Sequence, residues 1–329
     1  MLVKILNEAE IRRCVGMEEE ALQIVSEGFA KLALGEVTVP PIMRIDVPEN
    51  NGEVDVKTAY IHGLENFAIK IASGFLDNRT LGLATGSGMM VLVSAKTGRP
   101  EAVLLDNGYL TDVRTGIAGG IAARHLSREN ITTAGVIGSG MQARFQMRGL
   151  RLVRRFQELL VFGIDPQEVG QYVGDMTREF DLSVKAASSA EQVVHESDIV
   201  VTTTPSRQPY LKAEWLHPGL HITCMGSDAE HKQELYPQVF SQADLIACDL
   251  RSQVFRLGEL HHAFDAGVVT DQTSVIELGD IISGRSPGRT DDQQITICDL
   301  TGVGVQDTQI ARLAYQRGAA LGLDLEIGG

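Results

Sequence analysis

One glycine-rich turn constrains the fold of this chain more than any other feature. The segment GSGMQA, residues 138–143, has the spacing G-x-G-x-x-A and stands between the apolar run TAGVIG and an amphipathic stretch. In dinucleotide-binding folds the first glycine permits a tight turn, the second lets the backbone approach pyrophosphate, and the small third residue packs helix on strand. The pyrophosphate then lies at the helix N-terminus. The pattern predicts that a dinucleotide binds here, the alternative being a tight turn in another kind of α/β protein. The predicted cofactor residues of the turn are Gly138, Ser139, Gly140, Met141 and Gln142.

Strand and helix patterns alternate on both sides of this turn. The apolar runs are TAGVIG, ELLVFG, SVKAA, DIVVTTT, HITCMG, DLIACD and QITICD. Such alternation is typical of a parallel sheet that is covered by helices on both faces. We therefore expect a Rossmann domain over residues 127–303. Ser188 with Glu191 predicts a capping box before one of its helices.

The first third of the chain has a different pattern. Asn7 with Glu10 is a helix N-cap signature, and an apolar stripe with helical spacing follows over residues 21–32. Short strand-like runs separated by turns then occupy residues 42–106, which predicts a sheet with its own core. Another helix is expected to begin with Thr111 as its N-cap. A final helix from about Gln306 is expected to fold back onto this first domain.

Length, charge and composition narrow the possible partners. The 329 residues are enough for two domains, and the net charge of −14 argues against binding nucleic acid, which needs clustered lysine and arginine. No apolar run approaches the roughly 18 residues of a membrane span, and MLVKILNEAE does not resemble a signal peptide. The four scattered cysteines fit reduced thiols and lack metal-ligand spacing. We expect a cytoplasmic protein with small-molecule ligands, and no metal, membrane or nucleic-acid partner.

The strand ELLVFG ends where NAD-binding proteins often place a carboxylate for the ribose hydroxyls. Asp165 is the acid available there, and no lysine or arginine stands beside it in sequence. This favours NAD over NADP, although NADP is not excluded, since Gly163 stands where an acidic or polar residue is often found. The alternative role for Asp165 is an N-cap before Pro166.

Four longer stretches share one family pattern. They are TGRPEAVLLDNGYLTDVRTGIAGGIAARHL, GSGMQARFQ, HITCMGSDAEHKQEL and TGVGVQD. In this order, across nearly the whole chain, they resemble the ornithine cyclodeaminase and mu-crystallin family. The wording DNGYLTDVRT is most similar to cyclodeaminase-like proteins of ectoine utilisation and, less closely, to iminosuccinate reductases. The resemblance implies a homodimer in which the Rossmann domain, 127–303, is inserted into an α+β substrate-binding and dimerisation domain, 1–126 plus 304–329.

The resemblance also places the substrate carboxylate among Arg44, Lys70 and Arg114, with Lys70 counted among the catalytic residues as well. The chemistry agrees, because arginine offers a planar fork to a carboxylate, and Arg114 is expected in the first turn of its helix, which favours an anion. The alternative is that each is a solvated surface cation.

Asp228, after the strand HITCMG, matches the catalytic aspartate of the family. At the carboxyl end of a parallel strand, a carboxylate can take a proton from the substrate amine or return it to an imine. The alternative is an N-cap for a helix beginning at Ala229. The resemblance further places two loops at the cofactor. Thr203, Thr204 and Pro205 line the nicotinamide side, and Thr301, Gly302 and Val303 close over it. Lys232 and Glu234 follow the family wording without an assigned role.

Lys57 departs from the cyclodeaminase pattern. It stands about where an acidic residue is expected in enzymes that accept a diamine, and a lysine in the pocket would repel a second ammonium and attract a second carboxylate. The leading hypothesis is therefore a reductase or dehydrogenase for the imine of a small, acidic amino acid, such as iminosuccinate. The second is a cyclodeaminase that releases ammonia and recycles its cofactor. A mu-crystallin-like binding protein is the third, and Asp228 with the cations disfavours it.

Overall fold

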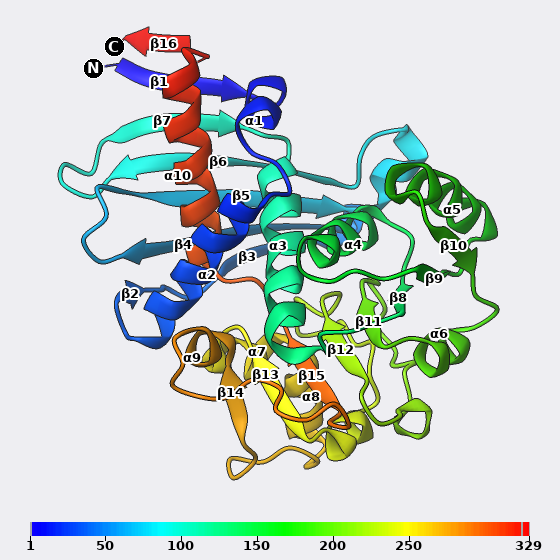
Figure 1. Cartoon of the computed structure of the whole chain (residues 1–329). Coiled ribbons are helices and arrows are strands. Elements are labelled where there is room, and N and C mark those ends of the chain that lie inside the picture. Colours follow the sequence, from blue (N-terminus) through cyan, green and yellow to red (C-terminus); the bar gives the residue numbers. More distant parts are fainter. Residues whose placement is uncertain (1, 324, 329) are drawn as a thin grey trace. The chain divides into compact units, whose positions relative to one another are not determined.

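The computed structural model describes residues 2–323 and 325–328, and these form two compact units (Figure 1). The first, unit 1, comprises Met1–Arg114 and Val303–Gly329, and the second, unit 2, comprises Thr115–Gly302. The first boundary falls inside α3 (Tyr109–Leu126), whereas the sequence indicated a boundary at the end of this helix. The reason is that α3 is one continuous helix. Its later turns belong to unit 2, where the Gln146 side chain donates to the Thr115 carbonyl at 2.9 Å.

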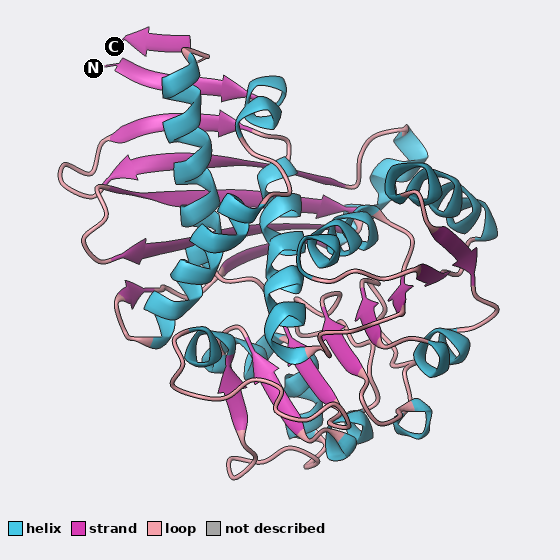
Figure 2. Cartoon of the chain, viewed as in Figure 1, coloured by secondary structure: helices cyan, strands magenta, loops and turns pink. Residues whose placement is uncertain are grey.

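Unit 2 is built on an eight-stranded sheet in which every described pairing is parallel (Figure 2). Its strands are β8 (Thr133–Ile137), β9 (Glu158–Phe162), β10 (Ser183–Ala186), β11 (Ile199–Thr202), β12 (His221–Cys224), β13 (Leu245–Cys248), β14 (Val275–Glu277) and β15 (Thr296–Asp299). They are arranged in the order β10-β9-β8-β11-β12-β15-β13-β14. The order reverses between β8 and β11, which is where doubly wound folds bind their ligands. The short strand β14 has no counterpart in the sequence prediction.

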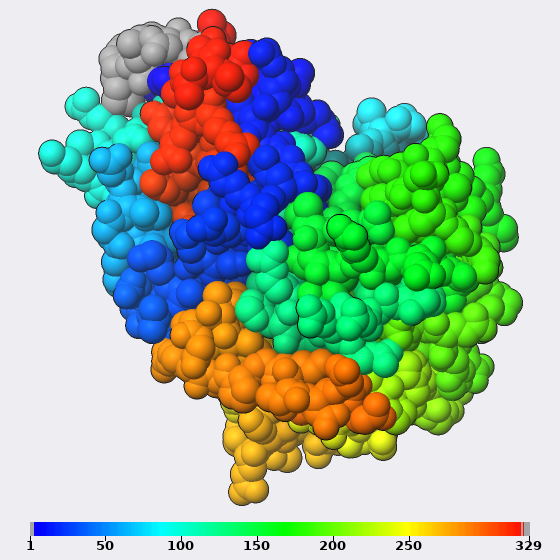
Figure 3. Space-filling view, in the orientation of Figure 1, coloured from blue at the N-terminus to red at the C-terminus, as the bar shows by residue number. Residues whose placement is uncertain are grey.

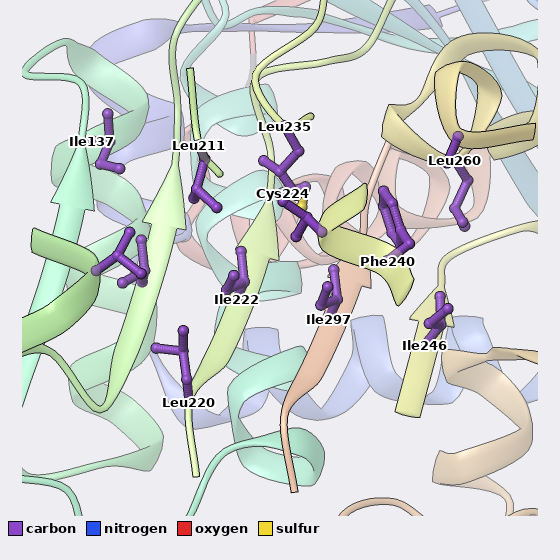
Figure 4. Packing of buried hydrophobic residues seen from close by; sticks show 14 of the residues in the cluster. Ile137, Leu211, Leu220, Ile222, Cys224, Leu235, Phe240, Ile246, Leu260 and Ile297 are labelled. Atoms are coloured by element: carbon purple, nitrogen blue, oxygen red, sulfur yellow. The ribbon is translucent and has the colours of Figure 1, made fainter. Parts of the chain in front are cut away.

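Apolar residues cover both faces of this sheet. Val136 and Val161 belong to one core, whereas Ile137 and Ile222 belong to the other. Figure 4 shows the second of these cores, with Ile222, Ile297 and Phe240 packed together. A strand buried on both faces reads as a continuous apolar run, and this explains why the sequence showed these strands so clearly.

Besides the later turns of α3, unit 2 contains further helices. They are α4 (Met141–Val153), α5 (Pro166–Phe180), α6 (Ala190–Glu196), α7 (Arg251–Leu257), α8 (Glu259–Asp265) and α9 (Leu278–Ile282). The predicted capping box is wrong by one residue. Ser189 is the N-cap of α6 and accepts from the Gln192 amide at 3.1 Å, while Ser188 bonds to the Gln192 side chain.

Unit 1 carries a second eight-stranded sheet, of mixed direction. Its strands are β1 (Leu2–Asn7), β2 (Val37–Thr38), β3 (Met43–Val47), β4 (Gly52–Ile61), β5 (Asn66–Phe75), β6 (Gly86–Ser94), β7 (Pro100–Leu105) and β16 (Leu325–Gly328). The order is β16-β1-β7-β6-β5-β4-β2, and β3 pairs with β4. The sequence analysis expected strands over residues 42–106, which contain β3 to β7, and it missed β1, β2 and β16, which lie outside that range.

Three helices of unit 1 pack on one face of its sheet: α1 (Glu8–Cys14), α2 (Glu19–Ala33) and α10 (Gly304–Leu321). The predicted capping box at the start of α1 is confirmed, since Asn7 and Glu10 bond reciprocally. The final helix folds back onto this unit as expected, and it contacts α2, β4 and β5. Figure 3 shows α10 in red beside α2 in blue.

Helix α3 begins earlier than predicted. Its first residue is Tyr109, and the Leu110 amide donates to the Asp106 carboxylate at 2.8 Å, so that Asp106 and not Thr111 supports the helix start. Arg114 therefore lies in the second turn, and the expected first-turn interaction with the helix dipole does not apply. Among the residues described, no helix is long and apolar enough to span a membrane.

Candidate active site

The turn between β8 and α4 has the form that a pyrophosphate requires. Gly138 adopts a φ of +112°, and a Cβ on it would lie 2.4 Å from Thr203 Oγ1, so the position needs glycine. Gly140 is the N-cap residue of α4, which has no side-chain cap within the described chain. A Cβ on Gly140 would meet no described heavy atom within 4 Å. Open space at an uncapped helix N-terminus fits a bound phosphate.

The loop after β11 lies against this turn. Thr203 Oγ1 donates to the Ile137 carbonyl at 3.1 Å, and Thr203 N donates to the same oxygen at 2.9 Å. The structure thus brings the predicted nicotinamide loop, residues 203–205, to the predicted pyrophosphate turn. Both stand at the point where the strand order reverses.

Asp165 caps α5. Its Oδ1 accepts from the Gln167 amide at 2.8 Å and from the Glu168 amide at 3.4 Å, and Pro166 is the first helical residue. The structure therefore has the capping geometry that was the alternative to ribose binding, and ribose binding stays a prediction. A Cβ on Gly163 would lie 3.0 Å from Ser139 Oγ, so close packing against the turn explains the glycine at that position.

The loop after β15 is held by Asp249. Its Oδ2 accepts from the Thr301 amide at 2.8 Å and from the Gly302 amide at 2.6 Å. Gln253 adds a bond to the Gly302 carbonyl at 3.0 Å. Thr301 and Gly302 are thus fixed within unit 2, while Val303 is the N-cap residue of α10 in unit 1.

Asp228 lies just past β12, and no helix begins at Ala229 in the described chain. The helix-cap alternative for Asp228 is therefore wrong. Its Oδ1 accepts from Lys232 Nζ at 2.7 Å, and its side chain is 38% exposed. The carboxylate is accessible at the carboxyl end of the sheet, where Lys232 forms an ion pair with it.

In unit 1, a buried carboxylate joins two of the predicted substrate cations. Asp307 Oδ1 lies 3.0 Å from Lys70 Nζ and 3.0 Å from Arg114 Nε. Arg114 also donates to Gln306 Oε1 at 2.8 Å. Burial, and after it the charge of Arg114, lower the pKa of Lys70 to about 7, and Asp307 opposes the fall. Lys70 therefore changes its charge near neutral pH.

Lys57 belongs to the same face of the sheet. It is the direct cross-strand partner of Lys70, and only 6% of it is exposed. Directly opposite residues project from the same face of a sheet, so the Lys57 side chain lies on the same face as that of Lys70. The Lys57 charge is one of the causes that lower the pKa of Lys70.

Asp106 directly follows β7 in the same unit. It is buried, its Oδ1 has no hydrogen-bond partner among the described residues, and burial raises its pKa to about 6. Lys70 acts on it electrostatically in the opposite sense. A buried carboxyl with an unbonded oxygen is a feature of functional sites.

Arg44 is engaged by acidic residues. Its Nε donates to Asp46 at 2.9 Å, it bonds to Glu53, and its Nη1 lies 3.6 Å from Asp55. A substrate carboxylate would have to compete with these partners, so the substrate role of Arg44 stays a prediction with less support than that of Lys70 or Arg114.

Sequence reasoning assigned no role to the acids that organise both units. Asp307, Asp249 and Glu234 are buried and bond to predicted site residues or their loops, and buried Asp106 supports the start of α3. Asp106 and Asp249 each follow a strand, Asp307 lies in the first turn of α10, and Glu234 lies within the quoted stretch HITCMGSDAEHKQEL; these positions are the signal that was available. Within the described chain, no group of three or more His, Cys, Asp or Glu residues could hold a metal ion.

These features define a class: a doubly wound unit of the dinucleotide-binding type combined with an α+β unit that buries a group of cations. The chain belongs to the ornithine cyclodeaminase/mu-crystallin family, whose model matches residues 3–320. A putative dehydrogenase of Rhizobium meliloti is 51% identical, covering 97% of this chain and 96% of that protein. An uncharacterized cyclodeaminase of Sinorhizobium fredii is 49% identical, covering 96% of each.

Solved structures give the same fold. The Δ1-pyrroline-2-carboxylate reductase of Thermococcus litoralis, in complex with NADH and L-proline, has a TM-score of 0.94 at 28% identity, covering 99% of this chain and 100% of that one. A dimeric archaeal alanine dehydrogenase with bound NAD has a TM-score of 0.91 at 33% identity, covering 100% and 99%. The iminosuccinate reductase of Paracoccus denitrificans, in complex with NAD⁺, has a TM-score of 0.91 at 28% identity, covering 100% of both chains.

Proposed function

We propose that this protein is an NAD-dependent imine reductase whose substrate is the imine of a small dicarboxylic amino acid, with iminosuccinate and its product aspartate as the leading pair. It is an enzyme of the same kind as the reductases and dehydrogenases to which it is similar. The observation that carries the choice of an acidic substrate is the burial of Lys57 directly opposite Lys70.

Charge favours a substrate with two carboxylates. Lys70 and Arg114 both contact one oxygen of Asp307, so one anion is shared by two cations, and Lys57 adds a third cation to the same face. A low-dielectric environment strengthens the attraction between such a group and a dianion. A diamine would instead bring another positive charge to Lys57, at a cost in binding free energy.

Each proposed residue then has a chemical task. Residues 138–142 would hold NAD(H) and residues 203–205 would line its nicotinamide side, and the bound cofactor would supply or accept the hydride. Lys70 and Arg114 bind the α-carboxylate, and Lys57 binds the side-chain carboxylate. Asp228 exchanges a proton with the substrate nitrogen, giving it during imine reduction and taking it during amine oxidation.

A cyclodeaminase is the second candidate, and one observation favours it. The Sinorhizobium fredii relative, at 49% identity, is described as a cyclodeaminase, and the wording DNGYLTDVRT resembles such proteins of ectoine utilisation. In that reaction ammonia is released without net consumption of NADH.

The deciding experiment follows NADH and product together. Oxaloacetate with ammonium supplies iminosuccinate, and NADH should disappear in equal amount to the aspartate formed. Faster turnover of pyruvate with ammonium, or of Δ1-pyrroline-2-carboxylate, would mean that the substrate is a monocarboxylate and not a dicarboxylate. Ammonia release from ornithine with no net change in NADH would establish the cyclodeaminase.

We also propose that the enzyme is a homodimer in the cytoplasm. On the sheet of unit 1, the face opposite Lys70 is apolar and open. Three of its large apolar side chains, Met43, Ile45 and Leu105, are 55%, 53% and 45% exposed. An apolar sheet face that no helix covers is typical of an interface between subunits. The similar archaeal alanine dehydrogenase is a dimer. The four cysteines are buried free thiols, which fit a reducing compartment.

Light scattering tests the dimer. The wild type should have twice the 35.6 kDa of one chain. Ile45→Glu and Leu105→Glu should lower that mass, since each buries a charge in the interface. Lys96→Glu, an exposed position on the β6–β7 turn, is the control. A monomeric wild type would contradict the proposal.

A further inference from the structure

Glu234 is fully buried in unit 2, and both of its carboxylate oxygens accept several hydrogen bonds. Oε1 accepts from the Thr204 amide at 2.7 Å, the Thr204 hydroxyl at 2.7 Å and the Tyr210 hydroxyl at 2.8 Å. Oε2 accepts from the Thr202 hydroxyl at 2.6 Å and the Gly226 amide at 3.0 Å. A carboxylate offers about four lone-pair sites, so these five donors occupy it completely.

The donors belong to the ends of two neighbouring parallel strands. Thr202 is the last residue of β11, Cys224 is the last residue of β12, and the two are register partners. The loop toward the predicted nicotinamide site begins at Thr203, and the loop that carries Asp228 begins at Met225. One side chain therefore ties these two loops together.

The fit at this junction leaves no space. A Cβ on Gly226 would lie 2.3 Å from the Thr204 carbonyl oxygen and 2.4 Å from Glu234 Oε2. Two backbones and a carboxylate thus meet at a point where only glycine fits. A small displacement of the carboxylate must move one of the two loops.

We propose that Glu234 is a positioning residue for the hydride-transfer reaction, which it serves by fixing Asp228 relative to the nicotinamide loop, Thr203–Pro205. The proposal rests on the proposed function, in which that loop lines the nicotinamide and Asp228 exchanges the proton. Asp228 lies two residues beyond Gly226, so its backbone is anchored at the same junction.

Hydrogen bonds within the segment between Gly226 and Glu234 hold Asp228 in a fixed position relative to both of these residues. Ser227 Oγ donates to the Lys232 carbonyl at 2.6 Å, and Lys232 Nζ donates to Asp228. Below the junction, Glu259 accepts from the Glu234 amide at 2.7 Å and from the Leu235 amide at 3.0 Å. The Glu234 backbone is therefore fixed from one side and its carboxylate from the other.

Ionised Glu234 suits all five contacts. Two of the donors are backbone N–H groups, which cannot accept a hydrogen bond, and the three hydroxyls donate in the same direction. Glu234→Gln replaces one acceptor oxygen by an NH₂ group, which would point a donor at the Thr204 amide or at the Gly226 amide. The buried, unmatched donors should push the loops apart.

The test compares Glu234→Gln with Tyr210→Phe. Tyr210→Phe removes one donor to the same carboxylate, and Tyr210 lies beyond the Thr203–Pro205 segment, so its turnover should stay within about threefold of wild type. Glu234→Gln should lower kcat by about tenfold to a hundredfold, as expected for a small misplacement of reacting groups. Its Kd for NADH should change little. The primary isotope effect with deuterated NADH should rise, because hydride transfer becomes slower than product release.

Gly226→Ala displaces the same junction from the other side, so it should give the same loss of kcat and the same rise in isotope effect. If Glu234→Gln does not fold, Gly226→Ala alone tests the positioning role of this junction. A wild-type kcat and isotope effect in a folded Glu234→Gln, or in Gly226→Ala, would overturn the proposal, whatever the change in thermal midpoint.

Failure of the proposed function can be recognised separately. The variants are assayed with whichever imine the wild type reduces, and a wild type that reduces none disproves the function. The emission of bound NADH then still reports on the nicotinamide loop. It should differ from wild type in Glu234→Gln and Gly226→Ala but not in Tyr210→Phe, and unchanged emission in the first two would overturn the positioning role.

Discussion

Lys57 and Lys70 stand directly opposite one another on the antiparallel strands β4 and β5, with both side chains buried. Like charges at such positions destabilise a sheet, and burial strengthens their repulsion. Asp307 Oδ1, which lies 3.0 Å from Lys70 Nζ, offsets part of that repulsion. We expect a substrate carboxylate beside Lys57 to offset more of it.

The first prediction concerns Lys57. Lys57→Glu should lower kcat/KM for iminosuccinate by about a hundredfold, since an attractive contact with the second carboxylate becomes a repulsive one. The Kd for NADH should stay close to wild type, because Lys57 belongs to unit 1 and the cofactor turn to unit 2. Lys57→Met, which keeps the apolar stem, separates loss of charge from loss of packing. Equal losses for pyruvate with ammonium and for iminosuccinate would argue against a role in recognising the second carboxylate.

The second prediction is a pH dependence. The pKa of Lys70 is lowered by burial to about 7. Its ammonium form is present below that pH and is lost above it, so binding of an anionic ligand should weaken as the pH rises. Between pH 7 and pH 8.5 the affinity for succinate should fall by more than about tenfold, as follows from the loss of the protonated fraction. Quenching of bound NADH fluorescence by succinate measures it. Affinity independent of pH over this range would contradict the assignment of Lys70.

The third prediction concerns Asp307, which raises the pKa of Lys70 against the effect of burial. Asp307→Asn removes that negative charge, so Lys70 should lose its proton at lower pH than in wild type. The fall in succinate affinity should begin below pH 7. Gln306→Ala, which removes a neutral partner of Arg114, is the control and should leave the midpoint of the fall unchanged. Tighter succinate binding in Asp307→Asn would mean that Asp307 competes with the substrate for the cations.

The sequence predicted the Rossmann unit best because its signals are local. The strands are buried on both faces and read as continuous apolar runs, and the 138–143 turn requires glycine for reasons of backbone geometry. The helix start at Ser188 was wrong by one residue. Ser188 and Ser189 have the same capping chemistry, and only Ser189 accepts from the backbone amide of Gln192.

The acids that organise the candidate site could not be predicted in the same way. Asp307 meets Lys70 across 237 residues of sequence, and Glu234 meets Thr202 across 32. No local periodicity encodes such contacts, which arise only when the sheets form. The direction of Lys57 likewise depended on the register of β4 against β5, which alternation alone does not give.

The fourth prediction tests the cofactor turn. Gly140→Val should weaken NADH binding by about tenfold or more, because its side chain enters the space where the pyrophosphate is expected. A Cβ at Gly140 meets no described atom within 4 Å, so the protein itself should fold as well as wild type. Gly138→Val is the contrasting variant, since it collides with Thr203 and should lower the thermal midpoint as well. Retained NADH affinity in Gly140→Val would place the dinucleotide elsewhere.

The last prediction concerns Asp228. Asp228→Asn keeps an oxygen that can accept from Lys232 but removes the group that exchanges a proton, so kcat should fall by about a hundredfold with NADH affinity unchanged. Lys232→Met is the matched variant. It removes the ammonium that lies 2.7 Å from the carboxylate and leaves the carboxylate in place, so its loss of kcat should be smaller. A near-normal rate in Asp228→Asn, or a larger loss in Lys232→Met than in Asp228→Asn, would assign the proton transfer to another group.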